Sequence, residues 1–300
     1  MSDSRENNDP HNSAVKYGKA FAFGIALNIL FVVVEVIFGI AANSSALLAD
    51  AGHNASDVLG LLFAWIAAWL ATLKPTGKYS YGYRKTTILV SILNAVLLFG
   101  AVAIIAWESL GKFKNPDPVE GTLMMLVAGV GVIINTITAL LFYKGQHTDL
   151  NIRGAFLHMA ADAAISLGVV IAGLMINLTG LYWIDPVVSM IIVAVIFWGT
   201  WHLFADSVNL ALDAVPKHIS IDEVKNHLLS KTGVKAVSDL HIWAVSTTQV
   251  ALTAHLIIPD GTDSDFIAEL NKEMKEKFNI VHTTFQIEHN NQNPECKLIQ

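Results

Sequence analysis

Runs of about twenty mostly apolar residues recur six times in the first two thirds of this 300-residue chain. A helix of that length crosses the roughly 30 Å hydrocarbon core of a bilayer, where only helices and closed barrels satisfy their own backbone hydrogen bonds. Charged residues make up only 15% of the chain, against about 25% in soluble proteins. We predict transmembrane helices over residues 16–41, 46–71, 86–108, 119–143, 155–178 and 184–206.

Basic residues between these runs lie mainly on one side of the predicted membrane. That side carries Arg5, Lys16, Lys19, Lys74, Lys78, Arg84, Lys85, Lys144 and Arg153. The opposite loops carry only Lys112 and Lys114. Because positively charged loops remain in the cytoplasm, we expect an integral multi-pass protein with both termini cytoplasmic. The polar stretch 1–12 lacks the apolar segment of a signal peptide, which suits a bacterial inner membrane.

From about Ser207 onward the pattern changes to that of a small soluble domain. Ser220 and Glu223 have the spacing of a capping box at a helix start. In order we predict this helix to about Thr232, strands at 237–245 and 249–258, a helix from Asp263 or Ser264 to about Phe278, and a strand at 282–288. The fold class is therefore an α-helical membrane protein with six transmembrane helices plus a small α+β domain of order α-β-β-α-β. We divide the chain into a tail (1–14), a transmembrane domain (15–206), a cytoplasmic domain (207–290) and a second tail (291–300).

Two of the predicted membrane helices each carry a histidine and an aspartate four residues apart: His53 with Asp57, and His158 with Asp162. Four-residue spacing places both side chains of a pair on one helix face. Ionisable groups in hydrocarbon are costly unless they face a partner, a cavity or an ion. Two imidazoles and two carboxylates form a tetrahedral set suited to Zn²⁺, whereas Mg²⁺ and Ca²⁺ prefer six or more oxygens. We call these four residues the His–Asp quartet and predict that it binds zinc.

Metal binding to such a set displaces protons, and protons displace metal, so a single site can couple the two fluxes. This is the chemistry of an antiporter. The alternatives are interhelical hydrogen bonds without metal, a membrane metalloenzyme, and a metal sensor that does not transport. An enzyme needs an open metal position, which a filled quartet does not offer, so we expect no enzyme activity. The cytoplasmic domain carries four more acidic than basic residues, which argues against nucleic-acid binding.

Four segments carry a family resemblance. The stretch from Asn43 to Asp57 resembles the second-span signature of cation diffusion facilitators, and His158 to Asp162 resembles the fifth-span motif. Asp185-Pro186 resembles the start of their sixth span, and Asp239 to Trp243 resembles their first cytoplasmic strand. The resemblance implies a homodimeric, proton-coupled exporter of cytosolic Zn²⁺ with a metallochaperone-like regulatory domain. Histidine at position 53 resembles the zinc-selective subgroup, with cadmium and cobalt as further candidate ions.

Three further carboxylates and a lysine are candidates for a role. Asp50 shares a helix face with the quartet residues of its own run, so it is an outer ligand, a proton-path residue or an ordinary interface carboxylate. Glu35, in the middle of the first run, could serve water access or proton transfer. The resemblance further implies that Lys85 pairs with Asp213 as an interdomain charge lock, although Arg84 and Thr87 beside it depart from the family pattern.

The cytoplasmic domain holds a second group of candidate ligands. By the resemblance, His255, His282 and Glu288 form a regulatory zinc site between strands and across the dimer. His241, Cys296 and His11 are possible additions, while Ser238 stands where some relatives have histidine. The alternative for all of these histidines is a solvated sheet surface without metal. The partners we expect are thus divalent metal ions, protons, the lipid bilayer and a second copy of the chain.

Overall fold

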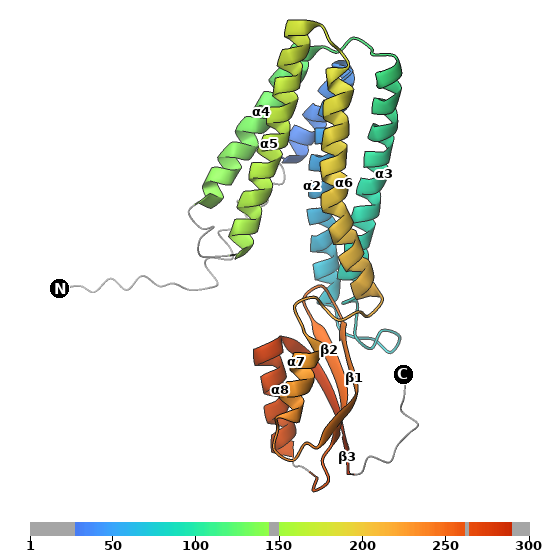
Figure 1. Cartoon of the computed structure of the whole chain (residues 1–300), viewed down its shortest axis with the longest axis vertical. Coiled ribbons are helices and arrows are strands. Elements are labelled where there is room, and N and C mark those ends of the chain that lie inside the picture. Colours follow the sequence, from blue (N-terminus) through green and yellow to red (C-terminus); the bar gives the residue numbers. More distant parts are fainter. Residues whose placement is uncertain (1–27, 144–149, 262–263, 290–300) are drawn as a thin grey trace, which may run out of the picture. The chain divides into compact units, whose positions relative to one another are not determined.

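The computed structural model describes residues 28–143, 150–261 and 264–289. Five of its helices are long and apolar enough to cross a membrane: α2 (Ser45–Ala71), α3 (Thr86–Lys114), α4 (Gly121–Tyr143), α5 (Leu150–Thr179) and α6 (Ile184–Ala211). A shorter apolar helix, Asn28–Ala41, precedes them (Figure 1). The predicted six-span architecture is therefore confirmed. The predicted start of the first span, at residue 16, lies outside the described residues.

The beginning of α2 is held by side chains of its own first residues and by a side chain of α6. Ser44 is the N-terminal capping residue, and its Oγ accepts a hydrogen bond from the Leu47 N–H at 3.1 Å. The buried Asp185 carboxylate of α6 accepts hydrogen bonds from the Ser44 hydroxyl, the Ser45 N–H and the Ala46 N–H at 2.5, 2.8 and 3.2 Å. These contacts satisfy N–H groups that have no partner inside the helix. They fix α2, the helix of His53 and Asp57, against α6.

Helices α4 and α5 approach closely because glycines face each other between them. A Cβ atom built on Gly121 would lie 2.7 Å from the Gly173 carbonyl oxygen, and one built on Gly173 would lie 2.7 Å from the Gly121 carbonyl oxygen. Small residues at such contacts allow membrane helices to pack backbone against backbone. Either substitution would push α5, the helix of His158 and Asp162, away from α4.

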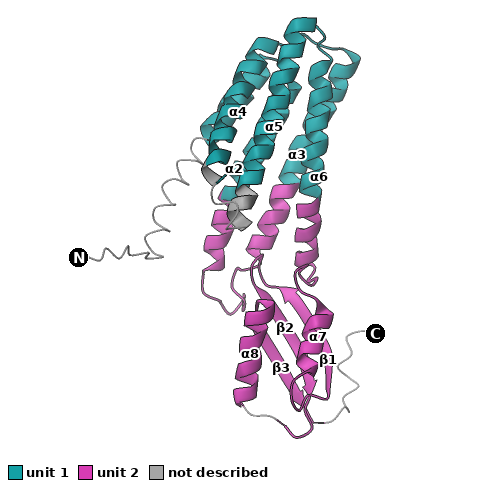
Figure 2. Cartoon of the chain, turned by 60° about the vertical axis from the view of Figure 1, so that its left-hand side comes forward, with its two compact units in different colours: residues 1–61, 96–201 teal, residues 62–95, 202–300 magenta. Residues whose placement is uncertain are grey.

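The chain divides into two compact units (Figure 2). Unit 1 comprises residues 1–61 and 96–201, and unit 2 comprises residues 62–95 and 202–300. Helices α2, α3 and α6 each begin in one unit and end in the other. The apolar core of unit 1 is built from aliphatic side chains of the membrane helices, among them Leu47, Met124, Val169, Ile176 and Ile192.

The C-terminal part of unit 2 has the predicted order α-β-β-α-β, which is confirmed. Its elements are α7 (Ile221–Leu229), β1 (Ala236–Ala244), β2 (Val250–Ile257), α8 (Ser264–Phe278) and β3 (Ile280–Glu288). The sheet order is β1-β2-β3, with an antiparallel β1–β2 pair and a parallel β2–β3 pair that α8 connects. Ser220 caps α7 as predicted, accepting from the Glu223 N–H at 3.3 Å, but α7 ends at Leu229 instead of near Thr232.

Alternation along β2 separates the two faces of this sheet. Leu252, Leu256 and the helix residue Met274 belong to the buried core. Thr253 and His255, which alternate with the core residues of β2, point to the opposite face. The polar face is therefore where the candidate cytoplasmic ligands are found.

Candidate metal centre

The His–Asp quartet forms a closed ring between α2 and α5 in unit 1. His53 Nε2 lies 3.2 Å from an Asp162 oxygen and 3.6 Å from an Asp57 oxygen. His158 Nε2 lies 3.3 Å from Asp57 and 3.7 Å from Asp162. The ligand atoms of His53, Asp57 and Asp162 all lie within 4.8 Å of one another. Each imidazole thus contacts both carboxylates, as the four-residue spacing on two adjacent helices predicts.

This spacing fits a tetrahedral zinc ion. Ligands bound at 2.0–2.1 Å in a tetrahedron lie about 3.3–3.4 Å apart, close to the 3.2–3.7 Å contacts of the ring. The two carboxylates carry the negative charge that a divalent cation needs away from water. Within the ring, the Asp162 side chain is 2% exposed and the His158 side chain 44%.

A second polar group lies beside the ring. Glu35, on the first described helix, accepts a hydrogen bond from the Asn54 amide at 2.9 Å. Asp50, one turn before Asn54 on α2, accepts one from the Ser166 hydroxyl of α5 at 2.8 Å. Both carboxylates are completely buried. Among the described residues, neither is hydrogen-bonded to a quartet side chain.

Sequence reasoning missed Asn54 and Ser166 as partners in this group. The signal for Ser166 was present, because it follows Asp162 by four residues and so shares its helix face. The signal for Asn54 was weaker, since it adjoins His53 and points to a different neighbouring helix. Contacts between helices that are distant in sequence depend on packing that spacing alone does not define.

The cytoplasmic candidates are brought together only in part. His255 Nδ1 lies 2.8 Å from a Glu288 oxygen, across the β2–β3 pair. His282 is exposed and pairs in register with Ala251, four residues from His255 along β2 and hence about 13 Å away. Its ring instead packs edge-on to the ring of Tyr81, with centroids 5.6 Å apart. His11 and Cys296 lie outside the described residues.

Asp239 joins this group through an irregularity in β1. The pairing of β1 with β2 shifts register between Ser238 and His241, and Asp239 has a positive φ of 48°. Its carboxylate lies 2.9 Å from His241 Nε2 and 3.5 Å from His255 Nε2. A chain of four groups, His241, Asp239, His255 and Glu288, therefore runs across the polar face of the sheet. Sequence reasoning missed Asp239 because regular alternation does not predict a β-bulge.

Lys85 and Asp213 form the expected ion pair, with Lys85 Nζ 2.7 Å from an Asp213 oxygen. Both side chains are about half exposed. The neighbouring Arg84 donates to the Gln249 side chain at 2.8 Å, and Thr87 Oγ1 accepts a backbone N–H of the same β1–β2 turn at 3.1 Å. The two positions that depart from the family pattern thus add hydrogen bonds beside the ion pair, all within unit 2.

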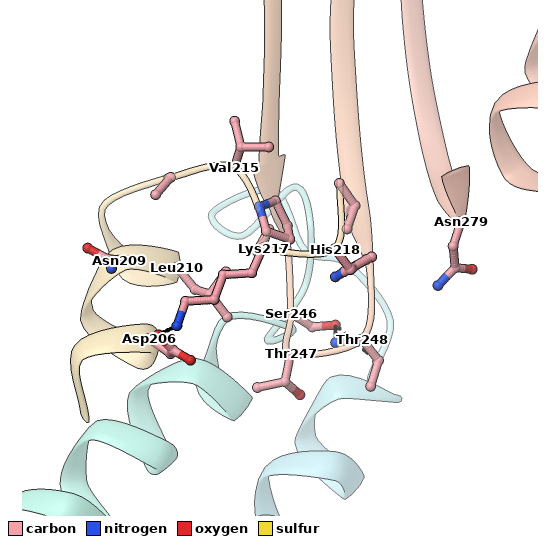
Figure 3. Close-up of a pocket in the computed structure, with 14 residues that line it drawn as sticks. Asp206, Asn209, Leu210, Val215, Lys217, His218, Ser246, Thr247, Thr248 and Asn279 are labelled. Carbon is pink, nitrogen blue, oxygen red and sulfur yellow. Dashed lines mark hydrogen bonds and ion pairs between the residues drawn. The ribbon is translucent and has the colours of Figure 1, made fainter. Parts of the chain in front are cut away.

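A cavity of about 360 Å³ lies in unit 2 near the end of α6 (Figure 3). Its labelled residues include Asp206, Asn209, Lys217, His218, Ser246, Thr247, Thr248 and Asn279. Lys217 Nζ lies 2.5 Å from an Asp206 oxygen, so the two opposite charges are paired with each other. Hydroxyl, amide and aliphatic groups make up most of the remaining lining. This chemistry offers no concentrated set of metal ligands, and the quartet remains the candidate metal centre.

Comparison with known families matches nearly the whole chain. The family model described as "Cation efflux transmembrane domain" matches residues 22–210, and the one described as "Cation efflux protein, cytoplasmic domain" matches residues 216–290.

Curated relatives are similar over most of their length. The metal cation efflux system protein CzcD of Cupriavidus metallidurans is 34% identical over 272 residues, 90% of this chain and 86% of the relative. The zinc transporter ZitB of Escherichia coli is 33% identical over 282 residues, 93% of this chain and 89% of the relative. The cadmium, cobalt and zinc/H(+)-K(+) antiporter of Bacillus subtilis is 30% identical over 272 residues, 88% of this chain and 87% of the relative. A solved metal-bound C-terminal domain of the CzcD transporter is 33% identical, covers 23% of this chain and 99% of that chain, and gives a TM-score of 0.22.

Proposed function

The chain belongs to the cation diffusion facilitator family of metal-efflux transporters, and we propose that it is a proton-coupled antiporter that exports Zn²⁺ from the cytoplasm. The family and the relatives are transporters and not enzymes. The observation that carries the proposal is the closed ring of the His–Asp quartet, whose contacts match the ligand spacing of tetrahedral zinc. Each ring member comes from a membrane helix, so the transported ion binds within the bilayer.

Proton coupling follows from the ligand chemistry. Zinc binds neutral imidazole and ionised carboxylate, so protons on these groups must leave when the metal enters. Protons that return to the empty ring favour release of the next metal ion. A relative in Bacillus subtilis is described as an antiporter of cadmium, cobalt and zinc with H⁺ and K⁺. We extend the exchange with protons to this chain and include cadmium and cobalt as further ions.

The protein is a multi-pass integral membrane protein, and we place it in a bacterial inner membrane with both termini in the cytoplasm. The asymmetry of lysine and arginine between the loops supports this orientation. The domain model that matches residues 216–290 is named for dimerisation. We therefore propose a homodimer that exchanges metal ions for protons across the bilayer and has no nucleic-acid partner.

The polar face of the sheet is our candidate for regulation by zinc. His255 and Glu288 already contact each other in one protomer, while His282 lies apart. His255 also contacts Asp239, which contacts His241, so these groups follow one another along the face. We propose that a second copy or a rearranged sheet edge completes the zinc site. We propose that the Lys85–Asp213 ion pair then couples zinc binding in this domain to a movement of the membrane helices.

Zinc-driven proton flux in proteoliposomes tests the transport function. A pH-sensitive dye inside the vesicles reports flux for the wild type and for His53→Ala, Asp57→Ala, His158→Ala and Asp162→Ala. We expect flux to be lost in all four variants. His218→Ala is the matched control, because it removes a histidine that lines the cavity of unit 2. Flux that persists at the wild-type level in the quartet variants would overturn the proposal, and zinc binding without any flux in the wild type would favour a sensor.

A further inference from the structure

Glu35 and Asp50 form a carboxyl pair that the zinc ring does not use. Asn54 and Asp50 are one turn apart on the same face of α2, and Asn54 holds Glu35 against that face. Each carboxyl group has one oxygen with a donor, from Asn54 or Ser166. Within the described part of the chain, Glu35 Oε1 and Asp50 Oδ1 are buried without a hydrogen-bond partner.

The surroundings of the pair leave little room for a hydrated ion. A Cβ atom built on Gly131 of α4 would lie 2.8 Å from the Phe31 ring and 3.1 Å from the Ser166 hydroxyl. Helix α4 therefore packs directly on the residues that flank the pair. The titratable ring members on the adjoining helix turns are His53, three residues after Asp50 on α2, and Asp162, four residues before Ser166 on α5. Across the described residues, no lysine or arginine is hydrogen-bonded or ion-paired to either carboxylate.

Two adjacent carboxylates without a cation cannot both stay ionised in a dry site, because like charges repel and burial disfavours charge. One shared proton removes the repulsion between the two carboxylates and lowers the cost of burying their charge. It reduces the charge of the pair to minus one, and it turns one of the two unpaired oxygens into a hydrogen-bond donor. The geometry thus fits a single proton held between Glu35 and Asp50.

We propose that the Glu35–Asp50 pair is a second proton site of the transporter, separate from the zinc ligands, and that it releases its proton when zinc fills the ring. This inference rests on the proposed antiport function and deepens it. When zinc replaces a single proton of the ring, the ring gains one positive charge, and this charge favours the ionised form of the neighbouring pair. The carboxyl O–H bond then breaks, the proton passes to water, and the pair becomes doubly ionised. When zinc leaves, the pair takes a proton back.

The number of protons released per zinc tests this role directly. Calorimetric zinc titrations of the full-length protein, in buffers with different ionisation enthalpies, measure that number for the wild type, Glu35→Gln and Asp50→Asn. Both variants keep all four ring ligands and the size of the changed side chain. We expect zinc affinity within about threefold of the wild type and about one proton fewer released per protomer. Glu108→Gln is the matched control, since it changes a carboxylate of unit 1 that is 42% exposed and paired with Lys112.

The vesicle assay gives a second readout. Zinc flux through Glu35→Gln should depend less steeply on pH than wild-type flux, while Glu108→Gln should keep the wild-type profile. An unchanged proton count together with an unchanged pH profile in both pair variants would overturn the second proton site. Failure of the antiport function is distinguishable, because the quartet variants would then still bind and transport zinc whatever the proton count of Glu35→Gln.

Discussion

The ring in unit 1 and the polar face of the sheet in unit 2 use the same side chains but hold them differently. In the ring, four side chains from two helices contact one another at 3.2–3.7 Å within a single protomer. On the sheet, His255 and Glu288 are paired, while His282 is exposed and contacts Tyr81. On the proposed function, the ring binds and releases an ion without help from a second copy. An incomplete set needs a rearrangement or a second copy before it binds, which suits regulation better than transport.

Removal of one ring ligand should have the largest effect on zinc binding and transport. Asp162→Ala deletes the most buried ligand and leaves a three-ligand ring with excess positive charge. Loss of a supporting residue outside the ligand set typically costs 10–100-fold in metal affinity, so we expect a loss on the order of 100-fold or more. Zinc titration and vesicle flux measure it. His282→Ala is the counterpart on the sheet and should leave basal flux unchanged; equal losses in the two variants would show that the regions are not functionally distinct.

The ring should also depend on the contacts that hold the start of α2. Asp185→Ala removes the acceptor of three hydrogen bonds and leaves the Ser45 and Ala46 N–H groups buried without it. Unsatisfied buried donors cost about 1–3 kcal/mol each, so we expect a loss of several kcal/mol and reduced flux. Thermal unfolding of the detergent-solubilised protein measures the first effect. Asp206→Ala, at the other end of α6 and 42% exposed, should change the unfolding temperature little, and the same small change in Asp185→Ala would contradict the role of this cap.

Changes to the contacts around Lys85 should have a smaller effect. We expect them to alter how strongly the cytoplasmic sheet influences zinc flux through the membrane helices. An exposed ion pair contributes up to about 1 kcal/mol, which corresponds to roughly a fivefold shift in an equilibrium. We expect Lys85→Asp to shift the zinc concentration that half-activates flux by about that factor, and Arg84→Ala to shift it less. The double variant Lys85→Asp with Asp213→Lys should restore the wild-type value. Failure of the double variant to recover would show that charge pairing is not what couples the two regions.

These two regions also show what a sequence alone can predict. The spans and the order α-β-β-α-β followed from apolar periodicity, and the contacts of the quartet followed from four-residue spacing on two helices. Four-residue spacing on a helix determines both the face on which the two side chains lie and their separation along the helix axis. Two such pairs therefore come into contact once their helices pack together. Alternation in a strand fixes only the face. The register that sets His282 opposite Ala251, and the bulge that turns Asp239 toward His255, depend on strand pairing, which no local pattern specifies. The role of the quartet as zinc ligands stays a prediction.

We expect the smallest effect from a substitution that weakens the contacts between α7 and α8, the two helices that cover the sheet. Glu273 of α8 contacts Lys231 and His227 at 2.5 and 2.9 Å. The hydrogen bond from Lys231, and then that from His227, lower the pKa of Glu273 below its ordinary value of 4.5. A lowered pKa means that this contribution to stability is fully present above the ordinary value and is lost as the pH falls through the lowered one.

Hydrogen exchange of α7 and α8 in the full-length protein, corrected for intrinsic rates, tests this contribution. At pH 7 we expect Glu273→Gln to open these helices up to about fivefold more often, since a partly exposed pair contributes about 1 kcal/mol or less. The difference from the wild type should shrink as the pH falls below 4.5, because the wild-type carboxylate then becomes neutral as well. Glu276→Gln is the control on the same helix, as its side chain is 62% exposed and only 3.9 Å from Lys272. A difference that persists unchanged at low pH would mean that Glu273 stabilises the helix pair by packing and not by charge.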